Sequence, residues 1–300
     1  MSVSNPMSIV NFMKAGEALP PGISVLLRAD HGLGKSQVIR YLRLRLMKQL
    51  NLEGFPLIDR RLSQMSEGDM IGLPSTDGEV TRFNPPDWYK QATREPCVLF
   101  LDELNRATPE VMQAAFQIVL DRELNGCKLH PDSRVYAAVN TGASYSVNEI
   151  DPALNDRFFI VDLVPTVKDW LDWARAECVM TDSKKFGKIN VDPVISDFIA
   201  HDEKWLDTPK NADPQKCHPS RRSWERVSDA LIHAGVIEDP DDQLFRLLTM
   251  GFVGTEASIA FRDYAKNFDA RISGVEILNK FTTKKVQEKM TRQSQEAKNS

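Results

Sequence analysis

A short loop that contains glycine, placed between an apolar run and a helical pattern, constrains the fold of this chain most. The apolar run at residues 23–27 predicts a buried strand, and apolar residues at helical spacing predict a helix over residues 37–50. The loop between them ends in Gly34, Lys35 and Ser36. Glycines in such a loop let backbone N–H groups surround phosphate oxygens, so this segment predicts a site for a nucleoside triphosphate.

The loop follows the spacing G-x-x-x-x-G-K-[ST] except at its first position, where this chain has Ala29. Alanine can replace that glycine if the backbone φ stays negative. We expect Lys35 to reach the β- and γ-phosphates and Ser36 to bind Mg²⁺. A chance Gly-Lys-Ser on a loop is the alternative, and the flanking strand and helix argue against it. The residues expected to hold the nucleotide are His31, Gly32, Leu33, Gly34, Lys35, Ser36 and Gln37.

Three further apolar runs predict strands, at residues 98–101, 135–139 and 158–164. They alternate with polar or helical segments, which indicates an α/β fold with a parallel sheet covered by helices on both faces. In such sheets, ligands bind beyond the carboxyl ends of the strands. Lys35, Asp102 and Asn140 all follow strand ends, so we expect one site to collect them.

The acidic pair Asp102 and Glu103 directly follows one of these apolar runs. We expect Asp102 to hold Mg²⁺ together with Ser36, directly or through water, and Glu103 to polarise the water that attacks the γ-phosphate. Asn140 is expected to contact the γ-phosphate and that water. Acids at strand ends also serve as helix caps, and an asparagine before Thr141 also forms turns, so these are the alternatives.

The domain organisation follows from changes in the sequence pattern. Residues 63–88 are rich in glycine and proline, and Asp77-Gly78 is a turn signal, so we expect a hairpin or loop insertion there. Helical patterns dominate after residue 165, and the end of the chain is polar and rich in lysine and glutamine. The expected parts are a nucleotide-binding α/β domain at 1–165, a helical domain at 166–280 and a polar tail at 281–300.

Composition limits the class of protein. With 42% hydrophobic residues in 300, the chain can bury one large core or two of ordinary size. A net charge of -4 gives no overall basic field for nucleic acid. The four cysteines stand far apart without a C-x-x-C pair, which fits reduced thiols in the cytosol. We see no signal peptide and no apolar run near the roughly 18 residues of a membrane span, so we expect a soluble cytoplasmic protein.

Several motifs occur in the order that is typical of one protein family. They are Asp102-Glu103-Leu104-Asn105-Arg106-Ala107, the insertion segments 62–64, 69–74 and 83–88, and the segments 151–158 and 219–225. Over roughly residues 8–235, the chain resembles the MoxR-type branch of the AAA+ ATPases, which carries an insertion in helix 2. The resemblance implies a P-loop α/β core, a smaller all-helical lid, and ATP with Mg²⁺ as cofactors.

The resemblance also implies roles for arginines. Arg157 would act as an arginine finger that reaches across a subunit boundary to the γ-phosphate of the neighbouring subunit. Arg222 would contact the phosphates in its own subunit, but Arg221 stands where the family has proline, so either of the two can be the nucleotide contact. For Arg157, the alternative is a surface ion pair with Asp156 or Asp162, worth at most about 1 kcal/mol.

By resemblance, the function is that of an ATP-hydrolysing ring, expected to be a homo-hexamer, that remodels a protein substrate or matures a partner with a von Willebrand factor A (VWA) domain. Arg106 and Arg122 would either be solvated or bridge the subunits. A DNA-directed AAA+ accessory or loader and an ATP-dependent assembly switch are the alternatives. The acidic net charge argues against nucleic acid, and Glu103, Asn140 and Arg157 together argue for turnover.

Overall fold

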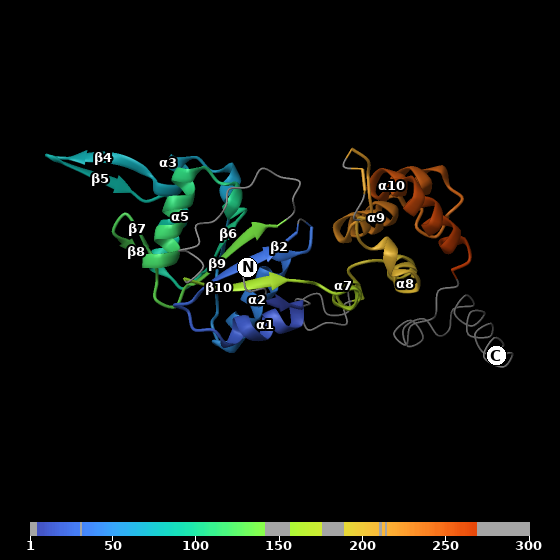
Figure 1. Cartoon of the computed structure of the whole chain (residues 1–300), viewed down its shortest axis with the longest axis horizontal. Helices are drawn as coiled ribbons and strands as arrows, with labels where there is room; N and C mark the ends of the chain where they lie inside the picture. The colour runs from blue at the N-terminus through green and yellow to red at the C-terminus, as the bar shows by residue number, and fades with distance from the viewer. Residues whose placement is uncertain are drawn as a thin grey trace. The chain divides into compact units, whose positions relative to one another are not determined.

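The computed structural model describes residues 5–30, 32–141, 157–175, 189–209, 212–213 and 215–268. The chain divides into two compact units, residues 1–188 and 189–300 (Figure 1). This differs from the predicted boundary after residue 165, because helix α7 (Val167–Ala174) belongs to the first unit. There, Trp173 Nε1 donates a hydrogen bond of 3.3 Å to the Tyr41 hydroxyl. The predicted tail at 281–300 lies outside the described residues.

The first unit is built on a six-stranded parallel sheet with the strand order β1-β10-β2-β9-β6-β3 (Figure 1). Its strands are β1 (Pro6–Met7), β2 (Ser24–Ala29), β3 (Leu57–Arg61), β6 (Val98–Asp102), β9 (Arg134–Asn140) and β10 (Phe158–Leu163). Ala29 pairs with Asn140, the last residues of β2 and β9. Arg61 pairs with Asp102, the last residues of β3 and β6. The predicted parallel sheet is confirmed, and four strands end together at one edge.

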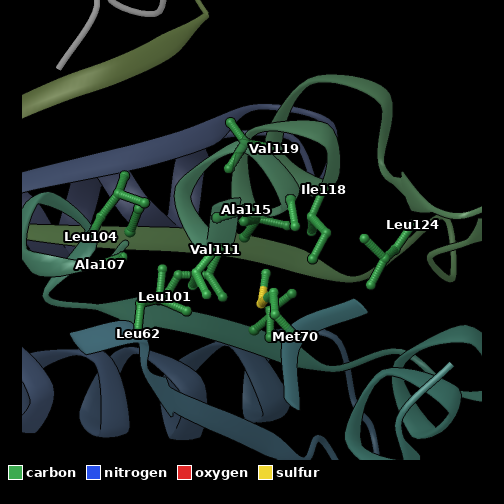
Figure 2. Close-up of a cluster of buried hydrophobic side chains, with 14 of the residues drawn as sticks. Leu62, Met70, Leu101, Leu104, Ala107, Val111, Ala115, Ile118, Val119 and Leu124 are labelled. Carbon is green, nitrogen blue, oxygen red and sulfur yellow. The ribbon is translucent and has the colours of Figure 1, made fainter. Parts of the chain in front are cut away.

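Helices cover both faces of this sheet, because alternate strand residues point to opposite sides and each side buries its own core. The helices are α1 (Ile9–Ala18) and α2 (Lys35–Gln49) on one face, and α4 (Asp87–Arg94) and α5 (Pro109–Asp121) on the other. On β6, Val98 and Phe100 belong to the core under α1 and α2, whereas Leu99 and Leu101 belong to the core under α5. Figure 2 shows this second core, in which Leu101 lies near Val111 of α5.

The insertion between β3 and α4 contains the predicted hairpin. It consists of η1 (Leu62–Gln64), α3 (Glu67–Ile71), β4 (Leu73–Asp77) and β5 (Val80–Asn84). The two hairpin strands are antiparallel and turn at Gly78, and every residue in both strands is exposed. Figure 1 shows the hairpin extending beyond the helices of this unit. A second, shorter hairpin, β7 (Glu123–Leu124) and β8 (Cys127–Lys128), follows α5.

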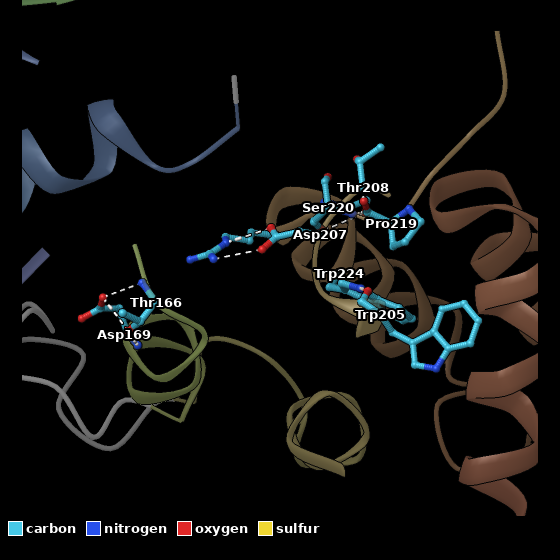
Figure 3. Close-up of polar contacts among 10 residues, drawn as sticks. Thr166, Asp169, Trp205, Asp207, Thr208, Pro219, Ser220 and Trp224 are labelled. Atoms are coloured by element: carbon cyan, nitrogen blue, oxygen red, sulfur yellow. Dashed lines mark hydrogen bonds and ion pairs between the residues drawn. The ribbon is translucent and has the colours of Figure 1, made fainter. Parts of the chain in front are cut away.

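The second unit is helical, as predicted. Its elements are α8 (Pro193–His201), η4 (Glu203–Trp205), α9 (Arg221–Ala234) and α10 (Gln243–Lys266). Aromatic rings form its core: the Phe198 ring centroid lies 5.5 Å from that of Trp224 and 5.3 Å from that of Phe261. The Phe245 ring stacks on Phe261 at 5.4 Å. Trp224 Nε1 donates a hydrogen bond of 2.7 Å to the Trp205 carbonyl, which joins α9 to η4 (Figure 3).

Within the described residues, α10 is the one helix that is long and apolar enough to cross a membrane by length and composition. We expected no run of that kind. The helix consists of two segments joined at Gly254, whose φ of 81° and ψ of 174° are not helical. Its Phe245, Val253 and Phe261 side chains are buried in the core of the helical unit. Packing inside this unit therefore accounts for part of its apolar composition, while Leu244, Leu247 and Ile259 are exposed.

Candidate nucleotide site

The loop between β2 and α2 has the backbone that its glycines predict. Gly32 and Gly34 both have a φ of 82°, and a Cβ on either would have open space, so backbone conformation alone requires glycine there. Ala29 is the last residue of strand β2 and has a negative φ. The condition under which alanine can replace the usual glycine is thus met. His31 lies outside the described residues.

Lys35, the first residue of α2, is buried with 8% of its surface exposed. Its Nζ donates hydrogen bonds of 2.7 Å to Asn140 Oδ1, 2.8 Å to the Ala29 carbonyl and 3.0 Å to the Asp30 carbonyl. These acceptors match the three N–H donors of an ammonium group. The contact with Asn140 joins two segments that are 105 residues apart, as predicted from their strand ends.

Of the other loop residues, Leu33 is half-buried and packs against the core under α1 and α2. Gln37 Nε2 donates a hydrogen bond of 3.0 Å to the Tyr41 hydroxyl on the next turn of α2. The Gln37 side chain is therefore engaged along its own helix.

Ser36 and Asp102 are brought together as predicted. Ser36 Oγ donates a hydrogen bond of 3.3 Å to Asp102 Oδ2, while Asp102 Oδ1 accepts one of 2.8 Å from the Glu103 N–H. Mg²⁺ prefers oxygen ligands, and at phosphate sites it takes one or two protein ligands plus phosphates and waters. A hydroxyl beside a carboxylate fits that donor set. In the part of the chain that the structure describes, no three His, Cys, Asp or Glu side chains gather into an all-protein metal site.

The backbone at Glu103 is left-handed, with φ 57° and ψ 38°, and its side chain is 13% exposed. Its carboxylate accepts a hydrogen bond from Ser63 Oγ. Arg106 NH1 lies 3.7 Å and Arg61 Nε 3.9 Å from the same carboxylate. Glu103 is therefore held by the end of β3 and the start of the insertion. We did not predict Ser63 or Arg61 as neighbours of the site.

Asn140, the last residue of β9, is fixed from two directions. Its side chain accepts the bond from Lys35, and its backbone is bound by Asn105 of η2 (Leu104–Arg106). Asn105 Nδ2 donates a hydrogen bond of 2.9 Å to the Asn140 carbonyl, and Asn105 Oδ1 accepts one of 3.3 Å from the Asn140 N–H. The next residue, Thr141, donates a hydrogen bond of 2.7 Å from its Oγ1 to Asp30 Oδ1. Asn140 is thus held at the very end of the strand, and the residues after Thr141 that would form the alternative turn lie outside the described residues.

The arginines of the first unit differ in their surroundings. Arg157 is exposed, directly before β10. Its alternative partner Asp162 instead forms two hydrogen bonds with Arg28, at 2.7 and 2.8 Å. Asp156 lies outside the described residues.

Arg122 lies at the end of α5, and its guanidinium donates to the backbone carbonyls of Pro21 and Ser133. Burial lowers the pKa of this guanidinium below its ordinary value. Arg122 is therefore anchored inside the unit, which corrects the prediction of a solvated residue, while a bridge between subunits stays a prediction.

In the helical unit, the two neighbouring arginines also differ in their surroundings. Arg221 is 10% exposed and makes two hydrogen bonds of 3.0 Å to the Asp207 carboxylate. Arg222 follows it at the second position of α9 and is exposed. Burial raises the pKa of Glu225 above its ordinary value, and the positive charge of Arg222 partly opposes that rise. Arg222 is the arginine of the pair that faces solvent.

A family model matches the part of the chain that holds this geometry. Residues 24–158 match the AAA domain of the dynein-related subfamily, from the first residue of β2 to the first residue of β10. No curated protein matches the sequence significantly.

Solved structures are similar to this chain at low identity. NtrX from Brucella abortus in complex with ADP is 15% identical, with a TM-score of 0.47, over 80% of this chain and 52% of that one. The RuvB Holliday junction branch migration motor of Thermotoga maritima is 20% identical, with a TM-score of 0.41, over 81% of this chain and 65% of that one. This chain thus spans about half the length of NtrX, and likeness at this level carries no functional argument.

Three observations from this chain agree. The glycine loop follows strand β2 of the parallel sheet, and Lys35 in this segment contacts Asn140 at the end of strand β9. The AAA domain match covers both strands. Residues 24–158, which hold this site, are similar to the AAA domain of the dynein-related subfamily.

Proposed function

We propose that this chain hydrolyses ATP with Mg²⁺ and, as a subunit of a hexameric ring, converts hydrolysis into remodelling of a partner protein. The observation that carries this proposal is that side chains from three separate segments meet at one sheet edge: Lys35, Ser36, Asp102, Glu103 and Asn140. Phosphoryl transfer to water needs a cationic clamp, a metal ligand and a group that orients the water. This set of side chains offers each of them.

In the proposed reaction, the Lys35 ammonium exchanges some of its present acceptors for phosphate oxygens. Ser36 and Asp102 would hold Mg²⁺, which would supply positive charge to neutralise the phosphate oxygens. Glu103 orients and polarises the attacking water. Because its Oδ1 accepts from Lys35, Asn140 has its amide nitrogen left as a donor for the γ-phosphate.

The proposed ring explains the arginines. Arg157 is exposed, as a side chain that acts on a neighbouring subunit must be. Arg222 is the better candidate for the phosphate contact within its own subunit, because Arg221 is already held by Asp207. An arginine supplied by a neighbour is worth ~10³–10⁵-fold in rate, so a monomer would turn over slowly.

We propose the β4–β5 hairpin as the contact with the partner or substrate. Leu73, Val80 and Phe83 are 69%, 57% and 43% exposed on it. The strand register puts Leu73 and Val80 on one face of the hairpin and Phe83 on the other. Exposed apolar side chains on an element that extends from the unit are typical of interaction sites. The resemblance to MoxR-type proteins favours a partner with a VWA domain. We also propose a cytoplasmic location, without a membrane or nucleic-acid partner.

The first experiment measures the oligomeric mass of the purified protein with and without a non-hydrolysable ATP analogue, together with phosphate release. We expect a ring near six subunits that releases phosphate. Lys35→Ala should abolish nucleotide binding, whereas Glu103→Gln should bind and assemble without turnover. Assembly without phosphate release in the unaltered protein would identify an assembly switch instead. A monomer without turnover would overturn the motor.

Mixing two inactive variants tests the shared site. Arg157→Ala subunits retain Glu103, and Glu103→Gln subunits retain Arg157. Where a Glu103→Gln subunit supplies its Arg157 to a neighbouring Arg157→Ala subunit, that neighbour has a complete site. Mixed rings should therefore regain part of the activity. The matched control mixes the double variant, which carries both substitutions, with Glu103→Gln, and should stay inactive. No recovery at any ratio in the first mixture would refute the action of Arg157 across subunits.

A further inference from the structure

We propose that Asn105 is a positioning residue for ATP hydrolysis, which acts by fixing the backbone of Asn140. The inference rests on the proposed function, because it assigns the group that holds one of the proposed catalytic residues. Asn105 is 5% exposed and Asn140 is 6% exposed, so their contact is shielded from water.

The Asn105 side chain takes the place of a strand partner for the Asn140 backbone. On its β6 side, strand β9 pairs only as far as Ala137, which lies opposite Leu101. Asn140 is three residues further along and would have no strand partner on that side. The Asn105 side-chain amide is the partner instead. Its Nδ2 donates a hydrogen bond of 2.9 Å to the Asn140 carbonyl, and its Oδ1 accepts one of 3.3 Å from the Asn140 N–H. A single side chain thus satisfies both backbone groups of one residue.

This contact controls where the Asn140 side chain lies. With its backbone held by Asn105 on one side and β2 on the other, Asn140 aims Oδ1 at Lys35 Nζ, 2.7 Å away. Buried backbone groups left without partners carry a free-energy cost, so loss of the Asn105 amide would make the end of β9 shift. Misplacement of a catalytic group by about 1 Å can reduce turnover 10²-fold.

The contact also explains why an asparagine is needed. Aspartate at this position has the same shape but no donor, so it would place a carboxylate oxygen against the Asn140 carbonyl. Alanine would lose both bonds. Asn105 lies two residues after Glu103, on the short turn that links the carboxylate to the next helix. The same turn therefore fixes Glu103 on one side and Asn140 on the other.

The experiment compares Asn105→Ala and Asn105→Asp with Asn125→Asp. Asn125 is a matched control, because its Nδ2 also donates to a backbone carbonyl, that of Ile71 at 3.1 Å, but at the base of the hairpin. We expect both Asn105 variants to lose about 10²-fold in kcat while the KM for ATP changes less than about threefold. The control should keep the kcat of the unaltered protein.

A double-mutant cycle separates this role from general destabilisation. If Asn105 acts through Asn140, then adding Asn105→Ala to Asn140→Ala should lower kcat by less than about twofold further. Hydrogen exchange at the Asn140 amide gives a readout independent of turnover, and it should accelerate in Asn105→Ala but not in the Asn125 control. If the unaltered protein releases no phosphate, the proposed function fails, and the exchange measurement still decides the contact. Unchanged exchange, unchanged kcat or full additivity would each overturn the role of Asn105.

Discussion

Gly72 joins α3 to the first strand of the exposed hairpin, and its substitution by alanine should open the hairpin without unfolding the unit. The residue has φ 84° and ψ -172°, a region that is essentially restricted to glycine. A Cβ at Gly72 would lie 1.8 Å from the Asn84 carbonyl oxygen and 2.9 Å from its carbon. The contacted atoms are backbone, so no change of side-chain rotamer relieves the overlap.

The magnitude follows from comparison with Gly78 at the hairpin turn. Gly78 has φ 62° and open space around a Cβ, so Gly78→Ala costs about 1–2 kcal/mol for its left-handed backbone alone. Gly72→Ala has a comparable backbone cost plus the overlap, which we put at about 3 kcal/mol or more in total. A two-stranded hairpin is only marginally stable by itself. It should therefore detach from its base before the sheet behind it is affected.

The assay is hydrogen–deuterium exchange over residues 73–84, with thermal unfolding and basal phosphate release measured in parallel. We expect Gly72→Ala to lose protection across both hairpin strands, and Gly78→Ala to keep most of it. The unfolding midpoint and basal turnover should change little in either variant, because the strands bury no core residue. Equal protection in the two variants, or unfolding of the whole unit in Gly72→Ala, would refute the reasoning.

Three further predictions concern single contacts. Ser63→Ala removes the hydrogen bond to the Glu103 carboxylate, a bond that must break before Glu103 can activate water. Basal phosphate release should therefore rise by up to about 10-fold. An unchanged or lower rate would contradict this. Arg28→Met leaves the half-buried Asp162 carboxylate without its guanidinium, so the first unit should lose about 1–3 kcal/mol in chemical denaturation, after discounting for partial exposure. Adding Asp162→Asn should restore part of that loss, and no restoration would argue against the ion pair. Burial raises the pKa of Asp192 in the folded state, so its charged form is disfavoured there at neutral pH. Asp192 is the N-cap of α8, where its carboxylate accepts a hydrogen bond from the Val194 N–H, and asparagine caps a helix as well as aspartate does. Asp192→Asn should therefore stabilise the helical unit at neutral pH, and the gain should vanish as pH falls below the ordinary aspartate pKa. A gain independent of pH would show that charge is not the cause.

Local patterns in the sequence were sufficient for the parts of the molecule that depend on near neighbours. The glycine loop, the strand before it and the helix after it follow from chain periodicity and from φ at Gly34. The hairpin turn at Gly78 and the start of α5 are equally local, since Thr108 accepts a hydrogen bond from the Val111 N–H three residues on. Strand β3 was missed, because three of its five residues are charged and its apolar content is too low to produce a pattern.

The tertiary structure decided which distant residues meet. Ser63 and Glu103 are 40 residues apart, and Asn105 and Asn140 are 35 apart, so neither contact leaves a periodic signal in the sequence. Arg122 is an anchor only because the end of α5 comes close to two carbonyls from other segments. The sequence by itself thus determined the nucleotide loop and the identity of its chemical groups, since those depend on backbone geometry over a few residues. The strand order and the register of the sheet decided how the carboxylate and amide groups are held, because hydrogen bonds between distant segments form only once the sheet has brought their ends to one edge.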